Sequence, residues 1–297
     1  MNPRRSLSGS ALRARPVSIL VLAAAGFAAG LPSQVLAQQA PATPPATRPA
    51  SKPAAAPQPL MEARALDLLR ASSARLAESK SLAFTATVGY EYPSRLGPPL
   101  LYTVRYEVLM QRPNRLRVLI PGDGPASQFF FDGRTIMAFA PERNLVEIEP
   151  APPTIDAALQ KAFQRSSLYF PFTDLLMSDP YRALTDGVFH AFRIGPSAVI
   201  GGVPTEMVAI ANKDVFLQIW IGVNDKLPRR IRAVYAADRL RLRHQMDLSD
   251  WKLDPPIPAG AFDSPQARAA RRMPFQNPGA PAPAGARPIP SPSGGRP

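Results

Sequence analysis

The chain has 297 residues, a formal net charge of +13 and no cysteine. Without cysteine it can form no disulfide, no thiolate nucleophile and no cysteine-ligated metal site. Proline accounts for 37 residues, well above the usual share of about 5%, and its concentration at both ends leaves a middle of roughly 200 residues for one folded domain.

The N-terminus has the features of a secretory signal peptide. Arginines precede an apolar run over residues 17–29, which is short for a transmembrane helix. Small residues before position 37 fit a signal-peptidase site, so we expect cleavage after about Ala37 and no stable transmembrane anchor afterwards. An uncleaved anchor helix is the alternative, and the pattern does not distinguish Sec from twin-arginine export.

Residues 38–59 are rich in proline and alanine and predict a disordered linker. Over residues 60–79, Leu66, Leu69 and Leu76 recur at helical spacing, with charged residues elsewhere around the helix. This pattern predicts an amphipathic helix. Such a helix needs an apolar surface to cover, because its intrinsic propensity alone leaves it marginal.

Apolar residues then alternate with polar ones, which predicts antiparallel strands. The expected strands are 82–92, 100–111, 115–121, 127–132, 135–140 and 145–149. A tight turn at residues 112–114 joins the second strand to the third. Asp132-Gly133 is typical of a two-residue hairpin turn between the fourth and the fifth.

A helical insert interrupts the strands. Thr154 predicts the N-cap of a helix that ends at Gln164, and shorter helices are expected over 173–177 and 179–184. The insert is rich in aromatic rings: Phe163, Tyr169, Phe170 and Phe172.

Strands resume after the insert and are expected at 189–194, 205–211, 215–221, 229–235 and 239–248. In the last of these, Arg239 and Arg241 alternate with Leu240 and Leu242. Beyond Asp250 the chain is expected to be irregular. The domain is expected to span residues 60–275, and residues 276–297 predict a disordered tail rich in proline and glycine.

About ten short antiparallel strands, with helices only at the start and in one insert, predict a mainly antiparallel α+β fold. The hairpin spacing predicts a barrel or a highly curved sheet, for which the N-terminal helix and the helical insert are the candidate covers. A parallel α/β fold would instead alternate strands and helices along the chain.

Groups suited to catalysis are few. His190 and His244 fall in separate predicted strands without metal-ligand spacing, and no G-x-S-x-G or S-x-x-K motif occurs. Glu147 and Glu149 lie two residues apart on one strand, which is more typical of a solvated face than of an acid/base pair. We therefore expect a protein that is not an enzyme and that has no cofactor or metal.

The positive charge has two candidate explanations. Basic residues either keep the surface soluble or face an anionic membrane. Export argues against a nucleic-acid partner.

Apolar rings on the strands are the remaining candidates for a site. A curved sheet that does not close has a concave face too wide for its own side chains to fill. A helix or a ligand must then cover that face. The predicted apolar lining consists of Tyr90, Tyr102, Tyr106, Met110, Phe129, Phe131 and Trp220. The alternative for each of them is a place in an ordinary core.

Several segments resemble the periplasmic lipoprotein carriers LolA and LolB. Arg112-Pro113-Asn114, the hairpin of residues 131–135 and the closing segment 258–265 each resemble a segment of these carriers in their order and spacing. Further runs resemble still more closely an uncharacterised family of predicted periplasmic proteins thought to share that fold; they are 200–204, 218–221, 227–230 and 249–251.

The resemblance implies a periplasmic protein with an incomplete, unclosed β-barrel, which the N-terminal helix and the helical insert cover as a lid. It also implies that Arg112 latches the lid by hydrogen bonding to the lid backbone; the alternative is a surface arginine in a turn. The implied function is binding of a lipid, an acyl chain or a lipoprotein in the apolar concavity. The alternative is an envelope protein-interaction or scaffold module that uses the barrel and the proline-rich tails.

Overall fold

The computed structural model describes residues 60–122, 125–236 and 238–273. The predicted signal peptide, linker and C-terminal tail lie outside the described residues.

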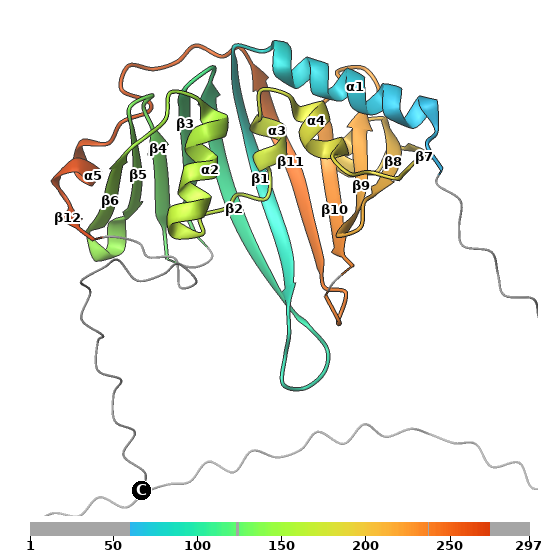
Figure 1. The fold of residues 1–297 in the computed structure, drawn as a ribbon, viewed down its shortest axis with the longest axis horizontal. Helices are drawn as coiled ribbons and strands as arrows, with labels where there is room; N and C mark the ends of the chain where they lie inside the picture. The colour runs from blue at the N-terminus through green and yellow to red at the C-terminus, as the bar shows by residue number, and fades with distance from the viewer. Residues whose placement is uncertain (1–59, 123–124, 237, 274–297) are drawn as a thin grey trace, which may run out of the picture. The chain divides into compact units, whose positions relative to one another are not determined.

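One sheet of twelve strands organises this part of the chain, in the order β12-β6-β5-β4-β3-β2-β1-β11-β10-β9-β8-β7 (Figure 1). Neighbouring strands pair antiparallel, except that β12 is parallel to β6. The strands are β1 (Ser81–Tyr92), β2 (Leu100–Gln111), β3 (Arg115–Ile120), β4 (Ser127–Phe131), β5 (Thr135–Ala140), β6 (Leu145–Pro150), β7 (His190–Ser197), β8 (Thr205–Ala211), β9 (Val215–Gly222), β10 (Pro228–Tyr235), β11 (Arg243–Leu253) and β12 (Arg271–Arg272). The two ends of this order do not pair, so the sheet is not closed into a barrel, and the predicted fold class is confirmed.

Helices cover one face of the sheet, which we call the inner face (Figure 1). They are α1 (Ala63–Glu78), α2 (Ile155–Ser166), α3 (Thr173–Leu176) and α4 (Pro180–Thr185). As predicted, Thr154 caps α2: its hydroxyl accepts a hydrogen bond of 3.3 Å from the amide of Ala157. The short helices η1 (Pro141–Arg143), η2 (Ile200–Gly202) and α5 (Pro265–Ala269) lie in connections.

The main core lies between the inner face and the helices. Alternate residues of β1, such as Phe84, Ala86 and Val88, point inward and are buried. Leu69 and Leu76 of α1 belong to the same cluster. Burial of one such side chain stabilises the fold by about 1.5–3 kcal/mol, so the sheet supplies the apolar surface that the amphipathic helix requires.

The segment after β11 covers parts of the opposite, outer face. Ala261 and Phe262 pack against Leu109 of β2. Ala267 and Ala270 cover a second small cluster, which includes Phe130, Met137, Phe139 and Val146. The predicted irregular structure after Asp250 is therefore wrong, since β11 continues to Leu253 and α5 and β12 follow. A bulge opposite residues 83–85 of β1 and a positive φ of 56° at Asp250 interrupt the alternation from which a strand is recognised.

The predicted strand 239–248 begins too early. Residues 239–242 form a turn, in which the Asp238 carboxylate accepts hydrogen bonds from the amides of Leu240 and Leu242. Arg241 has a φ of 49°, which lies outside the β region of regular strands. The alternation of arginine and leucine here imitates a strand, but the local hydrogen bonds of an aspartate decide the turn.

The outer-face packing of the C-terminal segment gives a prediction about stability. Phe262 is 3% exposed, so we expect Phe262→Ala to lower the free energy of unfolding by about 3–5 kcal/mol. The control is Phe163→Ala, because Phe163 is 55% exposed and its truncation should cost about 0.5 kcal/mol or less. Chemical denaturation measures both; equal effects would show that residues 254–273 do not belong to the folded unit.

Candidate ligand-binding site

The connection from α2 to α3 crosses the inner face and carries the rings of the insert. Ser167, with a φ of 53°, ends α2 by donating its amide to the carbonyl of Phe163. Phe170 and Phe172 then stack on each other, with 5.6 Å between ring centroids. Phe170 packs edge-on against Phe129 of β4 at 5.4 Å. These buried ring contacts fix the connection to the sheet.

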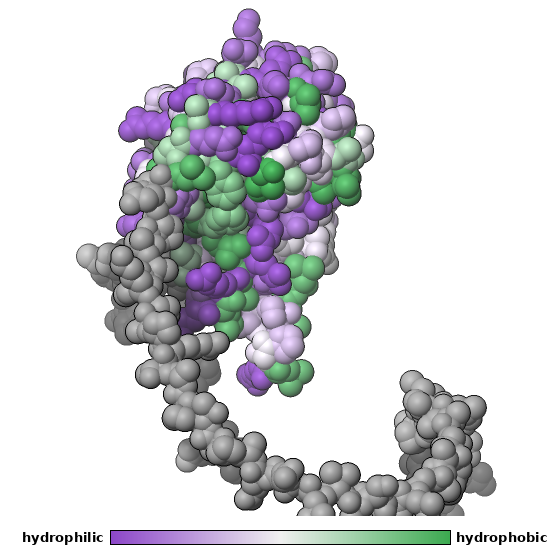
Figure 2. All heavy atoms as spheres, turned by 90° about the vertical axis from the view of Figure 1, so that its right-hand side faces the viewer, coloured by the Kyte–Doolittle hydropathy of each residue, from purple (hydrophilic) through white to green (hydrophobic). Residues whose placement is uncertain are grey.

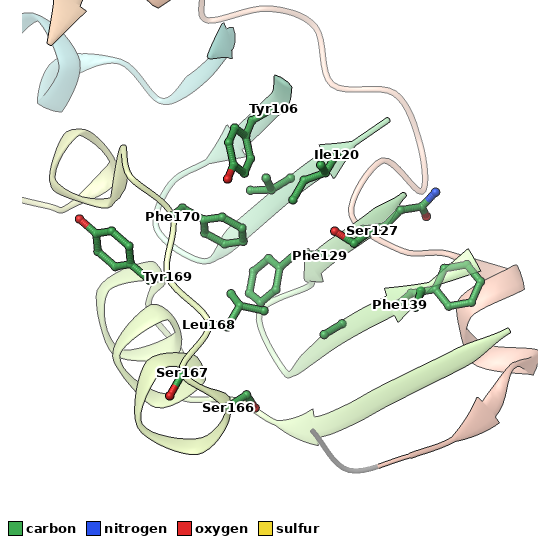
Figure 3. A pocket seen from close by; sticks show the side chains of 14 residues that line it. Tyr106, Ile120, Ser127, Phe129, Phe139, Ser166, Ser167, Leu168, Tyr169 and Phe170 are labelled. Carbon is green, nitrogen blue, oxygen red and sulfur yellow. The ribbon is translucent and has the colours of Figure 1, made fainter. Parts of the chain in front are cut away.

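A pocket of about 360 Å³ lies between this connection and strands β2 to β5 (Figure 3). In the figure the Phe129 ring, the Phe170 ring and the Leu168 side chain lie next to one another in its lining. Ser127, Ser166 and Ser167 also belong to the lining, and the Ser166 hydroxyl donates a hydrogen bond to Glu147. The other lining residues are Tyr106, Val118, Ile120, Gln128, Ala138, Phe139, Ala140 and Tyr169. This combination of rings, branched chains and few polar groups suits an apolar ligand.

Two further pockets lie on the other side of the connection. One, of about 500 Å³, is bounded mainly by apolar side chains of α2 and the connection, including Leu159, Phe163 and Met177. The other, of about 160 Å³, lies between α3, α4 and strands β1 and β9 to β11. Tyr169 lines all three pockets. The three pockets therefore adjoin one another at this residue.

Tyr169 and Phe170 have opposite environments although they are neighbours in the chain. Phe170 is 4% exposed and Tyr169 is 53% exposed, and Figure 3 shows the two rings on different sides of the connection. Tyr169 touches Phe163 edge-on at 6.5 Å between ring centroids. The lining thus includes exposed rings, which gain free energy when they are covered.

The smallest of the three pockets contains titratable groups without ionic partners. Burial raises the pKa of Asp174, and no described residue makes a hydrogen bond or ion pair with its carboxylate. Burial, and then the nearby Asp174 carboxylate, raise the pKa of both Tyr169 and Tyr235. Burial lowers the pKa of His244, although Asp238 and Glu91 oppose this shift. All four groups are therefore held towards their uncharged forms.

The paired carboxylates of β6 bind α2 to the sheet. Glu149 forms ion pairs with Lys161 and Arg165, at 3.6 Å and 3.1 Å. Glu147 accepts a hydrogen bond from the Ser166 hydroxyl at 3.1 Å. Burial alone would raise the pKa of Glu149, but these hydrogen bonds and charges lower it. The two glutamates face a helix, so the expected solvated face is wrong; the reason is that α2 covers this edge of the inner face.

The structure distributes the predicted lining residues over different environments. Tyr106 and Phe129 line the first pocket. Met110 and Phe131 are fully buried in the packed core. Tyr90 and Tyr102 stack at 5.6 Å further along the β1–β2 hairpin and belong to none of the pockets described above.

Trp220 is on the outer face, so its assignment to the lining is wrong. Its neighbours Ile219 and Ile221 point into the core, and strict alternation places Trp220 on the other side. There its ring lies under the Arg230 guanidinium, 5.9 Å from the ring centroid. The sequence prediction missed lining residues from the insert and from the end of β10, such as Leu168 and Tyr235. The aromatic rings of the insert were the only sequence signal for this region.

Arg112 extends from the end of β2 towards the helices. Its guanidinium donates to the Leu176 carbonyl of α3 at 3.2 Å and to the Leu76 carbonyl of α1 at 3.4 Å. Burial lowers the pKa of Arg112, and the Asp156 carboxylate partly offsets this shift. One cation thus bridges the C-terminal ends of two covering helices, where backbone carbonyls carry partial negative charge.

Histidines, aspartates and glutamates do not form a cluster suited to a metal ion anywhere in the described ranges. None of the helices in these ranges combines the length and the apolarity needed to cross a bilayer.

An unclosed antiparallel sheet, with helices over one face and apolar pockets between the two layers, is the class of fold that the LolA-like segments led us to expect. The chain belongs to the family of predicted periplasmic proteins DUF2092, whose model matches residues 65–276. The expected family and the periplasmic location are thereby confirmed. A comparison with curated protein sequences finds no match.

Solved structures similar to this chain include the lipoprotein LppX of Mycobacterium tuberculosis, at 14% identity over 67% of this chain and 99% of that chain, with a TM-score of 0.42. The LolA superfamily protein NE2245 of Nitrosomonas europaea is 13% identical over 67% and 97%, with a TM-score of 0.35. Pseudomonas aeruginosa MucA/MucB, solved as a complex, is 14% identical over 69% and 62%, with a TM-score of 0.38. Each of these likenesses has a TM-score below 0.5.

The unpaired carboxylate of Asp174 gives a prediction about pH. Its pKa is raised above the ordinary 3.8, so the folded state holds this proton at a higher pH than the unfolded state does. Stability is therefore lost as the pH rises through the folded pKa. We expect Asp174→Asn to increase the free energy of unfolding at pH 7, and this gain to shrink as the pH falls towards 3.8.

Denaturation curves at several pH values measure this difference between variant and wild type. Asp214→Asn is the control, because the Asp214 side chain is 67% exposed. A gain at Asp174 that does not vary with pH would contradict the assignment.

Proposed function

We propose that the protein is a non-enzymatic periplasmic carrier or sensor, which binds a lipid, an acyl chain or an acylated protein between its sheet and its helical cover. The observation that carries the proposal is the set of apolar pockets that meet at Tyr169. Affinity would come chiefly from buried apolar area. The hydroxyl-bearing residues of the first pocket would meet the polar part of the ligand.

Extraction of the purified protein with organic solvent, followed by mass spectrometry, tests for a bound lipid. A fluorescent fatty-acid probe tests for binding to the emptied protein. We expect a co-purified lipid and saturable probe binding. Absence of both would contradict the proposal.

A pocket-filling variant localises the binding. Ala138 lines the first pocket and is only partly covered, so the larger side chain of Ala138→Trp should occupy the space of the ligand. We expect the Kd of the probe to rise by about tenfold or more, which corresponds to at least about 1.4 kcal/mol. The matched control, Ala259→Trp, adds the same ring at an exposed position. Equal affinities of the two variants would exclude the first pocket.

We further propose that Arg112 acts as the latch of the cover. Its two hydrogen bonds hold α1 and α3 to the end of β2, so the cover must lose them in order to lift. Arginine suits this role because its planar fork donates in two directions at once.

Arg112→Leu should therefore speed release of the probe more than it lowers the melting temperature. Arg112→Lys should resemble Arg112→Leu, because one ammonium group does not reproduce the fork. Stopped-flow displacement measures release, and Arg115→Leu, at an exposed position of the same hairpin, is the control. Release rates identical to wild type would contradict the latch.

A second candidate function, binding of an envelope protein, is favoured by the edge of β7. Residues 60–62 occupy the start of this edge: Ala191 exchanges backbone hydrogen bonds with Leu60 and Glu62. The amide of Arg193 donates a hydrogen bond to the Glu62 carboxylate. The edge strand then continues through Ile194, which is 43% exposed. An extended peptide could add to such an edge. If this alternative is correct, Ile194→Pro should abolish pull-down of the partner, because proline removes a backbone N–H from the edge. Binding of the fatty-acid probe should remain intact.

A further inference from the structure

The β1–β2 hairpin extends beyond the helical cover and ends in a protruding tip (Figure 1). We define the tip as residues 92–102. Its apolar side chains are among the most exposed of the described residues: Leu96 is 91% exposed, Leu101 69% and Tyr92 58%. Folding gains nothing from side chains left in water, so an exposed apolar tip indicates an interaction surface.

Strand pairing holds the base of the tip, and residues 93–99 form the connecting turn. Tyr92 pairs with Leu100 and Tyr90 with Tyr102 across the two strands. The Tyr102 ring contacts both tyrosines of β1, at 5.6 Å and 6.2 Å between centroids. Leu101, between Leu100 and Tyr102, projects to the opposite face of the hairpin. Apolar side chains therefore lie on both faces of the tip. This arrangement suits insertion of the tip into an apolar layer better than contact with one flat surface.

Positive charge accompanies the apolar side chains. Arg95 is next to Leu96 and exposed. The turn before β11 adds Arg239 and Arg241 on either side of Leu240, which is 58% exposed. β11 pairs with β1 directly, so this turn is the neighbour of the hairpin. Figure 2 shows hydrophobic and hydrophilic residues side by side at the protruding end.

Two acidic groups lie near the tip: Glu91, which has a cationic partner, and Asp238 of the neighbouring turn, whose carboxylate accepts hydrogen bonds from the amides of Leu240 and Leu242. Glu91, at the base of the tip, forms an ion pair with Arg243. The Arg243 hydrogen bonds lower the pKa of Glu91, against the effect of burial. Among the described residues, no ion pair involves Arg95, Arg239 or Arg241. These arginines remain available to an anionic partner.

We propose that the tip docks the protein onto an anionic lipid surface. Leu96 and the leucines of β2 enter the outer acyl region, the tyrosine rings lie at the headgroup level, and the arginines contact lipid phosphates. Aromatic side chains with one apolar and one polar end favour the membrane interface, and basic residues favour anionic headgroups. This surface is distinct from the pockets that carry the proposed function, since Leu96, Leu100 and Leu101 line none of those described above.

Because the chain has no cysteine, a single Leu96→Cys substitution accepts one environment-sensitive fluorophore. The labelled protein is mixed with vesicles of phosphatidylcholine, with or without phosphatidylglycerol. We expect a blue shift only with the anionic vesicles, reversed by salt. Val199→Cys is the control, because Val199 is 83% exposed but lies in the turn between β7 and β8. No shift at position 96, or an equal shift at 199, would overturn the proposal.

A double variant, Leu96→Asp with Leu101→Asp, tests the same proposal without a label. We expect co-sedimentation with anionic vesicles to weaken by about tenfold or more, while Val199→Asp behaves as wild type. Binding of the fatty-acid probe should be unchanged in the double variant, which separates failure of docking from failure of the cavity. Undiminished co-sedimentation, or loss of a protein dimer instead of vesicle binding, would overturn the proposal.

Discussion

The inner face of an unclosed sheet must be covered, and the remainder of the structure follows from this requirement. Its buried residues form one continuous cluster with α1 and the insert. A closed barrel would fill this space with its own side chains. Here separate helices fill it, and rings on a short irregular connection fill it imperfectly. The pockets lie at that junction because a connection of few residues cannot match the surface of a curved sheet as closely as a continuous helix does.

Polar groups at the same junction are few, and removing each of them partly from water costs free energy. The Arg112 guanidinium is partly buried, which lowers its pKa, yet it satisfies carbonyls at the ends of two helices. Asp174 is half-buried and has no hydrogen-bond or ionic partner among the described residues, and its pKa is raised. Such groups resist tight closure of the two layers, because full burial of an unpaired charge costs more than apolar contact returns. In the proposed latch, the two Arg112 hydrogen bonds are the contacts that opening of the cover would break.

β2 connects the two proposals. Its inner face carries Tyr106 at the first pocket and Tyr102 at the exposed tip, four residues and about 13 Å apart at the rise of a strand. The same alternation that builds the core continues past the edge of the cover, where no helix meets it. A docked tip would hold the pocket close to the lipid surface from which an acyl chain could be taken or to which it could be given.

The sequence by itself determined most strands and the covering helices, because period-two and period-3.6 patterns depend on one-sided burial and persist without knowledge of partners. The open sheet and the family came instead from the resemblance of short segments to known families. It also pointed to Arg112. The sequence did not determine which rings share a pocket. Trp220 has the chemistry of a lining residue, but the alternation of side chains along β9 places its ring on the outer face of the sheet. Nor did it reveal the turn at residues 239–242 or the C-terminal segment on the outer face, where local hydrogen bonds and a bulge override the pattern. Tertiary structure decided these points, because a side chain's environment depends on what other segments, distant in the chain, place opposite it.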